Sequence, residues 1–235
     1  MKEYILNLEK EFSLIENGFK EQEKRAFADY KSNSNEHSKK LAFLAYKSNV
    51  YQVRMYGVFL FGYLSSDEEI LRFCDNMEEK CLEILRGKVD TEFFRNAIDF
   101  IRKYADGLHH KKEEDILFAA MLENLGPVAE KVVRGGMLVE HQMARGYVME
   151  LENNLNLFEK SKDDLSKLHI LTNAMAYVEL LRNHAEKENK TVYPFADKSL
   201  TEDIKLKVAK EMDKRIQEEE KFLEDKRKLM RELGI

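Results

Sequence analysis

Residues 97–118 read AIDFIRKYADGLHHKKEEDILF, and this stretch decides the fold. Its apolar residues recur every three or four positions, which predicts an amphipathic helix. On a helical projection of 100° per residue, Ala105 and Ile116 lie on one apolar stripe. His109 and Glu113 fall on this stripe or at its edge. Burying the charge of Glu113 without a partner costs free energy, and a bound metal ion would offset that cost.

The same stretch contains two His-x-x-x-Glu pairs, His109/Glu113 and His110/Glu114. Residues four apart share one helical face, so each pair could bind one metal cluster. The second pair is turned by about 100° from the first. We therefore expect His109 and Glu113 to face the interior as ligands, with His110 and Glu114 behind them as supporting residues.

Two further predicted helices carry the same residue types. His141 falls on an apolar stripe of its helix, and His184 and Glu188 are again four residues apart. Imidazole and carboxylate donors together suit iron, manganese or zinc. An alternative without a metal stays open, in which each histidine is a core residue with satisfied hydrogen bonds. In that case Glu113 and Glu188 would be surface partners of nearby lysines.

Helical patterns continue on both sides of this stretch. We expect helices at about residues 2–30, 36–48, 50–64, 66–86, 91–124, 128–158 and 161–195, and a charged helix from about 199 to the C-terminus. Pro194 is expected to stop the helix that contains it. Four of these helices, joined by short loops, predict an all-α, up-down-up-down four-helix bundle. The expected domains are an N-terminal helical extension (1–65), a metal-binding bundle (66–198) and a C-terminal charged helix (199–235).

Composition argues against several classes of protein. A net charge of −5 disfavours a nucleic-acid partner. No run approaches the ~18 uninterrupted apolar residues of a membrane span, and the first residues open directly into an amphipathic pattern without a leader. Cys74 and Cys81 form neither a redox CxxC motif nor a zinc pair. They are typical of reduced core thiols, which favours a cytoplasmic location.

From about Asp67 to Phe195 the chain resembles the bacterial hemerythrin HHE cation-binding family. The motifs that carry the resemblance are residues 97–106, 109–118, 125–127 (Leu-Gly-Pro), 136–141 (Gly-Met-Leu-Val-Glu-His), 184–189 (His-Ala-Glu-Lys-Glu-Asn) and 193–194 (Tyr-Pro). The resemblance implies a non-haem site of two iron ions inside a four-helix bundle. It implies that His109, His141 and His184 are terminal iron ligands. It also implies that Glu113 and Glu188 bridge the two irons.

One position departs from the family pattern. The family usually has a histidine near the start of the first bundle helix, where this chain has Asp67 within Ser66-Asp67-Glu68-Glu69. Asp67 could be a substitute oxygen ligand, or it could merely complement the helix dipole. The third helix also has one histidine where oxygen-carrying members have a pair. Open metal positions would favour reactivity over reversible oxygen storage.

The resemblance implies a protein that binds or reacts with O2, peroxide or nitric oxide, in sensing, scavenging or peroxide decomposition; whether it is an enzyme stays open. Tyr147 or Tyr177 could donate a hydrogen bond there. One alternative is iron storage, sensing or iron-centre handling. Another is a helical scaffold that binds a partner protein and has a structural or vestigial metal site.

Residues 1–65 lie outside the family's usual domain and could pack on the bundle or form a homodimer. Residues 50–65 are weakly similar to helical-repeat proteins of the DNA-alkylation-repair type.

Overall fold

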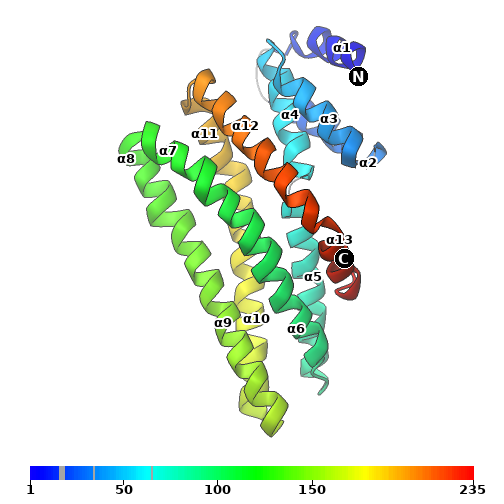
Figure 1. Ribbon diagram of the computed structural model, residues 1–235, viewed down its shortest axis with the longest axis vertical. Helices are drawn as coiled ribbons and strands as arrows, with labels where there is room; N and C mark the ends of the chain where they lie inside the picture. The colour runs from blue at the N-terminus through cyan, green and yellow to red at the C-terminus, as the bar shows by residue number, and fades with distance from the viewer. Residues whose placement is uncertain (16–18, 34, 65) are drawn as a thin grey trace. The chain divides into compact units, whose positions relative to one another are not determined.

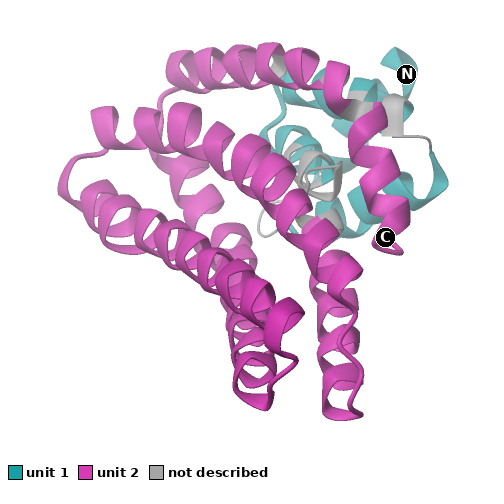
Figure 2. Ribbon diagram, turned by 60° about the horizontal axis from the view of Figure 1, so that its bottom comes forward, with its two compact units in different colours: residues 1–69 teal, residues 70–235 magenta. Residues whose placement is uncertain are grey.

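The computed structural model describes the backbone of residues 1–15, 19–33, 35–64 and 66–235, and every element in these ranges is a helix (Figure 1). Side chains are described for the same residues, apart from 35, 36, 39, 58, 59, 61–64, 66–69, 213, 220 and 223. The chain divides into two compact units, Met1–Glu69 and Ile70–Ile235 (Figure 2). The all-helical prediction is confirmed for the described residues.

Unit 1 consists of four helices around a small core of its own. They are α1 (Lys2–Phe12), α2 (Lys20–Ser32), α3 (Asn35–Tyr46) and α4 (Tyr51–Leu64). The apolar helix α4 packs against the other three. Within this unit, Asp29 accepts hydrogen bonds from the hydroxyls of Tyr4 (2.5 Å) and Tyr56 (2.6 Å).

The single helix predicted over residues 2–30 was wrong, because α1 ends at Phe12 and α2 begins at Lys20. The sequence between them includes Asn17 and Gly18, both of low helix propensity. These two residues lie outside the described part of the chain.

Unit 2 is built from long helical runs. The first run is α5 (Ser66–Leu85), whose opening turn precedes the unit boundary. The second joins α6 (Thr91–Phe100), η1 (Ile101–His110), η2 (Glu113–Phe118) and α7 (Ala119–Asn124), and the third joins α8 (Gly126–Ala129), η3 (Glu130–Met137) and α9 (Leu138–Ser161). The fourth joins α10 (Asp164–Lys187), η4 (Glu188–Val192) and α11 (Tyr193–Ser199). Segments η1 to η4 are π-helical. The helices predicted over 66–86, 91–124 and 128–158 are confirmed to within a few residues.

Local capping explains where two of these runs begin. The side chain of Asp90 accepts a hydrogen bond of 3.0 Å from the Phe93 amide at the start of α6. Asp163 accepts one of 2.9 Å from the Ser166 amide at the start of α10. Such caps satisfy amides that have no partner inside the helix, and each stabilises a helix by about 1 kcal/mol.

Two expectations about helix ends were wrong. The fourth run does not stop at Pro194 but continues to Ser199. Pro194 lies in the first turn of α11, directly after π-helical η4, where the loss of its amide donor is tolerated. The C-terminal helix is also not continuous, because the 3-10 turn η5 (Glu220–Phe222) separates α12 (Glu202–Glu219) from α13 (Leu223–Glu232).

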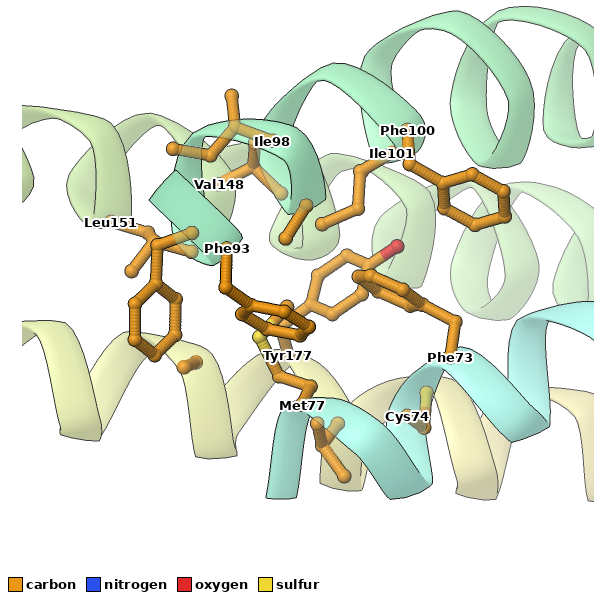
Figure 3. Close-up of a cluster of buried hydrophobic side chains, with 14 of the residues drawn as sticks. Phe73, Cys74, Met77, Phe93, Ile98, Phe100, Ile101, Val148, Leu151 and Tyr177 are labelled. Atoms are coloured by element: carbon orange, nitrogen blue, oxygen red, sulfur yellow. The ribbon is translucent and has the colours of Figure 1, made fainter. Parts of the chain in front are cut away.

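The main core of unit 2 contains buried residues from α5, α6, η1, α9, α10 and α13. Phe73, Phe100 and Tyr177 lie at its centre (Figure 3), with ring centroids of Phe73 and Phe100 4.9 Å apart. Helix α9 packs along α10, as Figure 1 shows, and α6 packs against both α9 and α13. Burying one such phenylalanine stabilises the fold by about 1.5–3 kcal/mol. Cys74 and Cys81 are buried free thiols in this core.

A second, smaller core lies further along the same helical runs and includes Phe118, Met121, Val133, Met137 and Val192. On each of the last three runs, the histidines and glutamates lie in sequence between residues of the first core and residues of the second. Apolar packing therefore encloses these residues on both sides. We call this group the polar belt; its buried members are His109, His110, Glu113, His141, His184 and Glu188. Among the described residues, no helix is both long enough and apolar enough to cross a bilayer.

Candidate metal centre

Six buried ionisable side chains gather in the polar belt of unit 2. They are His109, His110, Glu113, His141, His184 and Glu188. Burial of so many ionisable groups is costly unless they share a proton or a cation. Their residue types are nitrogen and oxygen donors that divalent metals accept.

The rings of His141 and His184 face each other through their Nε2 atoms, which are 3.0 Å apart. On the opposite sides of the rings, His141 Nδ1 lies 2.7 Å from Glu114 Oε1 and His184 Nδ1 lies 2.8 Å from Glu140 Oε2. An ionised carboxylate can only accept, so each Nδ1 donates its proton and sets the tautomer. In the neutral rings both Nε2 lone pairs then point at the same place, which suits a shared cation.

Two carboxylates complete the cluster. Glu188 Oε1 lies 3.1 Å from His184 Nε2, and Glu113 Oε2 lies 3.8 Å from His141 Nε2. One ligand atom from each of Glu113, His141, His184 and Glu188 lies within 4.8 Å of the others. The cluster could therefore hold a metal ion.

One of the two adjacent histidines is placed differently from the expectation. His110, predicted to turn away, is only 2% exposed, and its ring stacks on His141 with centroids 4.0 Å apart. A ring nitrogen of His110 lies within 4.8 Å of those of His141 and His184. His109 is buried as well, with Nε2 3.5 Å from Glu113 Oε2. In π-helix η1 hydrogen bonds span five residues, so each residue turns by less than 100° and both rings face inward.

Sequence reasoning missed the pair that supports these rings, Asp106 and Arg145. The Arg145 guanidinium donates to Asp106 Oδ1 and to Glu114 Oε1, each at 2.8 Å. Asp106 Oδ1 in turn lies 3.3 Å from His110 Nδ1. Burial raises the pKa of Asp106, but hydrogen bonds from His110 and Arg145 outweigh it and lower that pKa to about 2. The spacing 106–110–114 and 141–145, four residues each, was the available signal.

Burial also controls the protonation of three histidines of the cluster, His109, His110 and His141. It lowers the pKa of His141 to about 2, with neighbouring positive charge from His110 adding to the effect. It lowers the pKa of His109 well below its usual value, and that of His110 in the same direction. Neutral imidazole is the form that binds metals. These rings are therefore ready to act as ligands near neutral pH.

Sequence reasoning also missed a tyrosine that contacts the cluster. The hydroxyl of Tyr193 donates a hydrogen bond to Glu113 Oε1. Tyr147 is half-buried, whereas the hydroxyl of Tyr177 is fully buried without a hydrogen-bond partner among the described residues. Asp67 lies in the first turn of α5, and its side chain is outside the described part of the chain.

A family model for the hemerythrin HHE cation binding domain matches residues 67–196, more than half of the chain. The chain belongs to the hemerythrin HHE family. All six buried side chains of the polar belt lie within the matched region, so the hemerythrin domain contains the candidate metal centre.

Two solved structures are similar to the chain in sequence. AlkD2 from Streptococcus mutans is 30% identical, and the match covers 91% of this chain and 97% of that one, with a TM-score of 0.31. The protein smu.31 from Streptococcus mutans UA159 is also 30% identical, over 90% of this chain and 96% of that one, with a TM-score of 0.29. At such TM-scores the structural likeness supports no conclusion. A search of curated proteins found no match.

Proposed function

We propose that the hemerythrin domain of this chain holds two iron ions and that it binds or reacts with O2, peroxide or nitric oxide. The observation that carries the proposal is the facing pair His141 and His184, with Nε2 atoms 3.0 Å apart and each Nδ1 held by a glutamate. A carboxylate behind the ring is the usual support of a metal-binding histidine, because it fixes the tautomer and raises the basicity of the other nitrogen.

The proposed ligands are His109, His141 and His184, with Glu113 and Glu188 as the carboxylates between the two irons. His110 joins this set because its ring lies within reach of His141 and His184. Asp67 remains a proposed oxygen ligand at the position of the missing histidine. Manganese and zinc would accept the same donors, and family membership favours iron.

Bound iron would supply redox chemistry and an open coordination position for a small molecule. The residues of this chain would orient the metal ligands and exclude bulk water. Glu114 and Glu140 orient His141 and His184, and Tyr193 holds one oxygen of Glu113. The apolar cores on both sides of the belt keep bulk water away, which strengthens electrostatic interactions inside.

We extend the proposal to the architecture. The four runs 66–85, 91–124, 126–161 and 164–199 are proposed to form the up-down-up-down bundle. The shared core of α5, α6, α9 and α10 supports this. On this view residues 66–198 are the metal-binding bundle and 199–235 a C-terminal helical cover. Residues 1–65 are then an N-terminal helical extension that is proposed to form a homodimer, and the buried free thiols suit a cytoplasmic location.

The test is the metal content of aerobically purified protein, measured by ICP-MS with its near-UV and visible spectrum. We expect close to two irons per chain and iron charge-transfer absorption, both lost in Glu113→Ala. The matched control is Glu159→Ala, which removes a glutamate from an exposed ion pair with Arg95. A folded wild type without metal would contradict the proposal and leave the scaffold alternative. Bound iron without any reaction with O2, peroxide or nitric oxide would favour iron storage or handling instead.

A further inference from the structure

The C-terminal helices of unit 2 are anchored at both ends by apolar packing. Just before α12, Leu200 is buried in the second core, and at the far end Leu229 and Leu233 are buried in the main core. From Thr201 to Lys228 none of the described side chains is buried. Helix α12 nevertheless packs against η2, and Figure 1 shows it running alongside the second helical run. Polar contacts therefore hold the middle of this segment against the bundle helices.

Two ion pairs connect α12 to the stretch that carries proposed metal ligands. The Lys112 ammonium contacts both carboxylate oxygens of Glu219, at 3.2 and 3.0 Å. One helical turn away, Arg215 Nη2 lies 3.2 Å from Asp115 Oδ2. The side chains of Lys112 and Glu219 are only 16% and 17% exposed, whereas those of Arg215 and Asp115 are 31% and 37% exposed. Water therefore screens the charges of the Lys112 pair less than those of the Arg215 pair.

Lys112 lies within the ligand sequence itself. It follows π-helical η1 and stands directly before Glu113, the first residue of η2, and three residues after His109. Three residues advance a helix by about 5 Å along its axis, so the Lys112 charge is close to these proposed ligands. An ammonium there without a counter-ion would repel a metal cation bound in the polar belt. Glu219 supplies the counter-ion, although it lies outside the region that matches the hemerythrin family.

We infer that Glu219 raises the metal affinity of the candidate centre by neutralising Lys112. Its carboxylate contacts Lys112 rather than a proposed ligand, so Glu219 acts on the metal through that charge. The inference rests on the proposed function in one respect, that the polar belt binds a metal cation. It gives α12 a role in tuning the metal site, in addition to covering the bundle. Because the effect is electrostatic, the sign of each charge change sets the direction in which metal affinity moves.

The experiment is a titration of metal-free, full-length protein with Zn²⁺, in competition with a chelator of known affinity. Zn²⁺ accepts nitrogen and oxygen ligands and has no redox chemistry of its own. Glu219→Gln leaves the Lys112 charge unpaired and should weaken Zn²⁺ binding on the order of fivefold. Lys112→Gln removes the positive charge and should strengthen Zn²⁺ binding. The double variant Lys112→Gln/Glu219→Gln should bind Zn²⁺ like the wild type.

The matched control is Arg215→Gln, which breaks the neighbouring ion pair between the same two helical segments but removes a positive charge. It should not weaken Zn²⁺ binding. Weaker binding in all three single variants would show that the ion pairs only dock α12, and it would overturn the inference. Unchanged affinity in Glu219→Gln would overturn it as well. Should Glu219→Gln fail to fold, Lys112→Gln decides alone, because tighter binding supports the inference and unchanged or weaker binding overturns it.

The two proposals can fail separately. Opposite changes of Zn²⁺ affinity in Glu219→Gln and Lys112→Gln, in a protein that takes up no iron, would keep this inference and remove the proposed function. Two reactive irons per chain, in a protein whose Zn²⁺ affinity is the same in every variant, would keep the function and remove this inference. A protein that binds neither Zn²⁺ nor iron would overturn both.

Discussion

Tyr193 donates a hydrogen bond from its hydroxyl to Oε1 of Glu113, although 80 positions separate the two residues. Tyr193 begins α11 directly after η4, and Glu113 begins η2. The contact joins two helical runs at a proposed bridging carboxylate. It fixes one oxygen of Glu113, while the other lies 3.5 Å from His109 and 3.8 Å from His141.

Replacing Tyr193 with phenylalanine should weaken metal binding without unfolding the protein. The change removes only the hydroxyl, so Glu113 keeps its place in the packing but loses the donor that orients it. Loss of a group that supports a metal ligand typically lowers affinity by about 10- to 100-fold. Competition with a chelator of known affinity measures the change. Tyr104→Phe should leave affinity unchanged, and equal losses in both variants would contradict a specific role for Tyr193.

Arg145→Gln should lower both metal affinity and stability. Arg145 donates to the carboxylates of Asp106 and Glu114, which contact His110 and His141. Losing these charge-assisted hydrogen bonds should reduce the free energy of unfolding by about 1.5–3 kcal/mol. Urea denaturation and metal titration provide the two readings.

The matched control for Arg145→Gln is Arg95→Gln, which breaks a more exposed pair with Glu159. Such a surface pair contributes less than about 1 kcal/mol. A variant of Arg145 that behaves like this control would show that the network does not position the histidines.

The stability of the metal-free protein should fall as the pH drops below about 6.5. Burial lowers the pKa of His141 to about 2, whereas histidine in an unfolded chain titrates near 6.5. Between these values the unfolded state binds more protons, so acidification favours unfolding by up to about 1.4 kcal/mol per pH unit for each such histidine. Urea midpoints at pH 7, 6 and 5 test this. His141→Gln should flatten the dependence and exposed His169→Gln should not; equal slopes in all three proteins would refute the assignment.

Cys74 and Cys81 should resist thiol reagents in the folded protein. Burial is the main cause that raises the pKa of each thiol to about 12, well above the value of about 8.5 for a free cysteine. Because the thiolate is the reactive form, modification at pH 8 should be at least ~100-fold slower in native protein than in urea. Absorbance during reaction with a disulfide reagent follows the rate. Rapid modification of both thiols under native conditions would show that this core opens easily.

The sequence by itself determined the helical runs between about residues 66 and 161 and the residue types of the candidate metal centre. Periodic apolar positions, the capping residues Asp90 and Asp163 and the histidine–glutamate spacing all act within a few residues of one another. Local interactions of this kind can be inferred from the order of residues alone. The family motifs belong to the same local information, and the match over residues 67–196 confirms the family.

Only the tertiary structure decided which side chains meet. His110 faces the cluster because η1 is π-helical, and the 100° projection cannot anticipate that change of hydrogen-bond register. Arg145 reaches Asp106, and Tyr193 reaches Glu113, across separate helical runs. Helices pack by burying large apolar side chains such as Phe73 and Phe100, and that packing sets the rotation of each helix about its axis. Contacts between helices depend on this rotation, which residues distant in the sequence determine together.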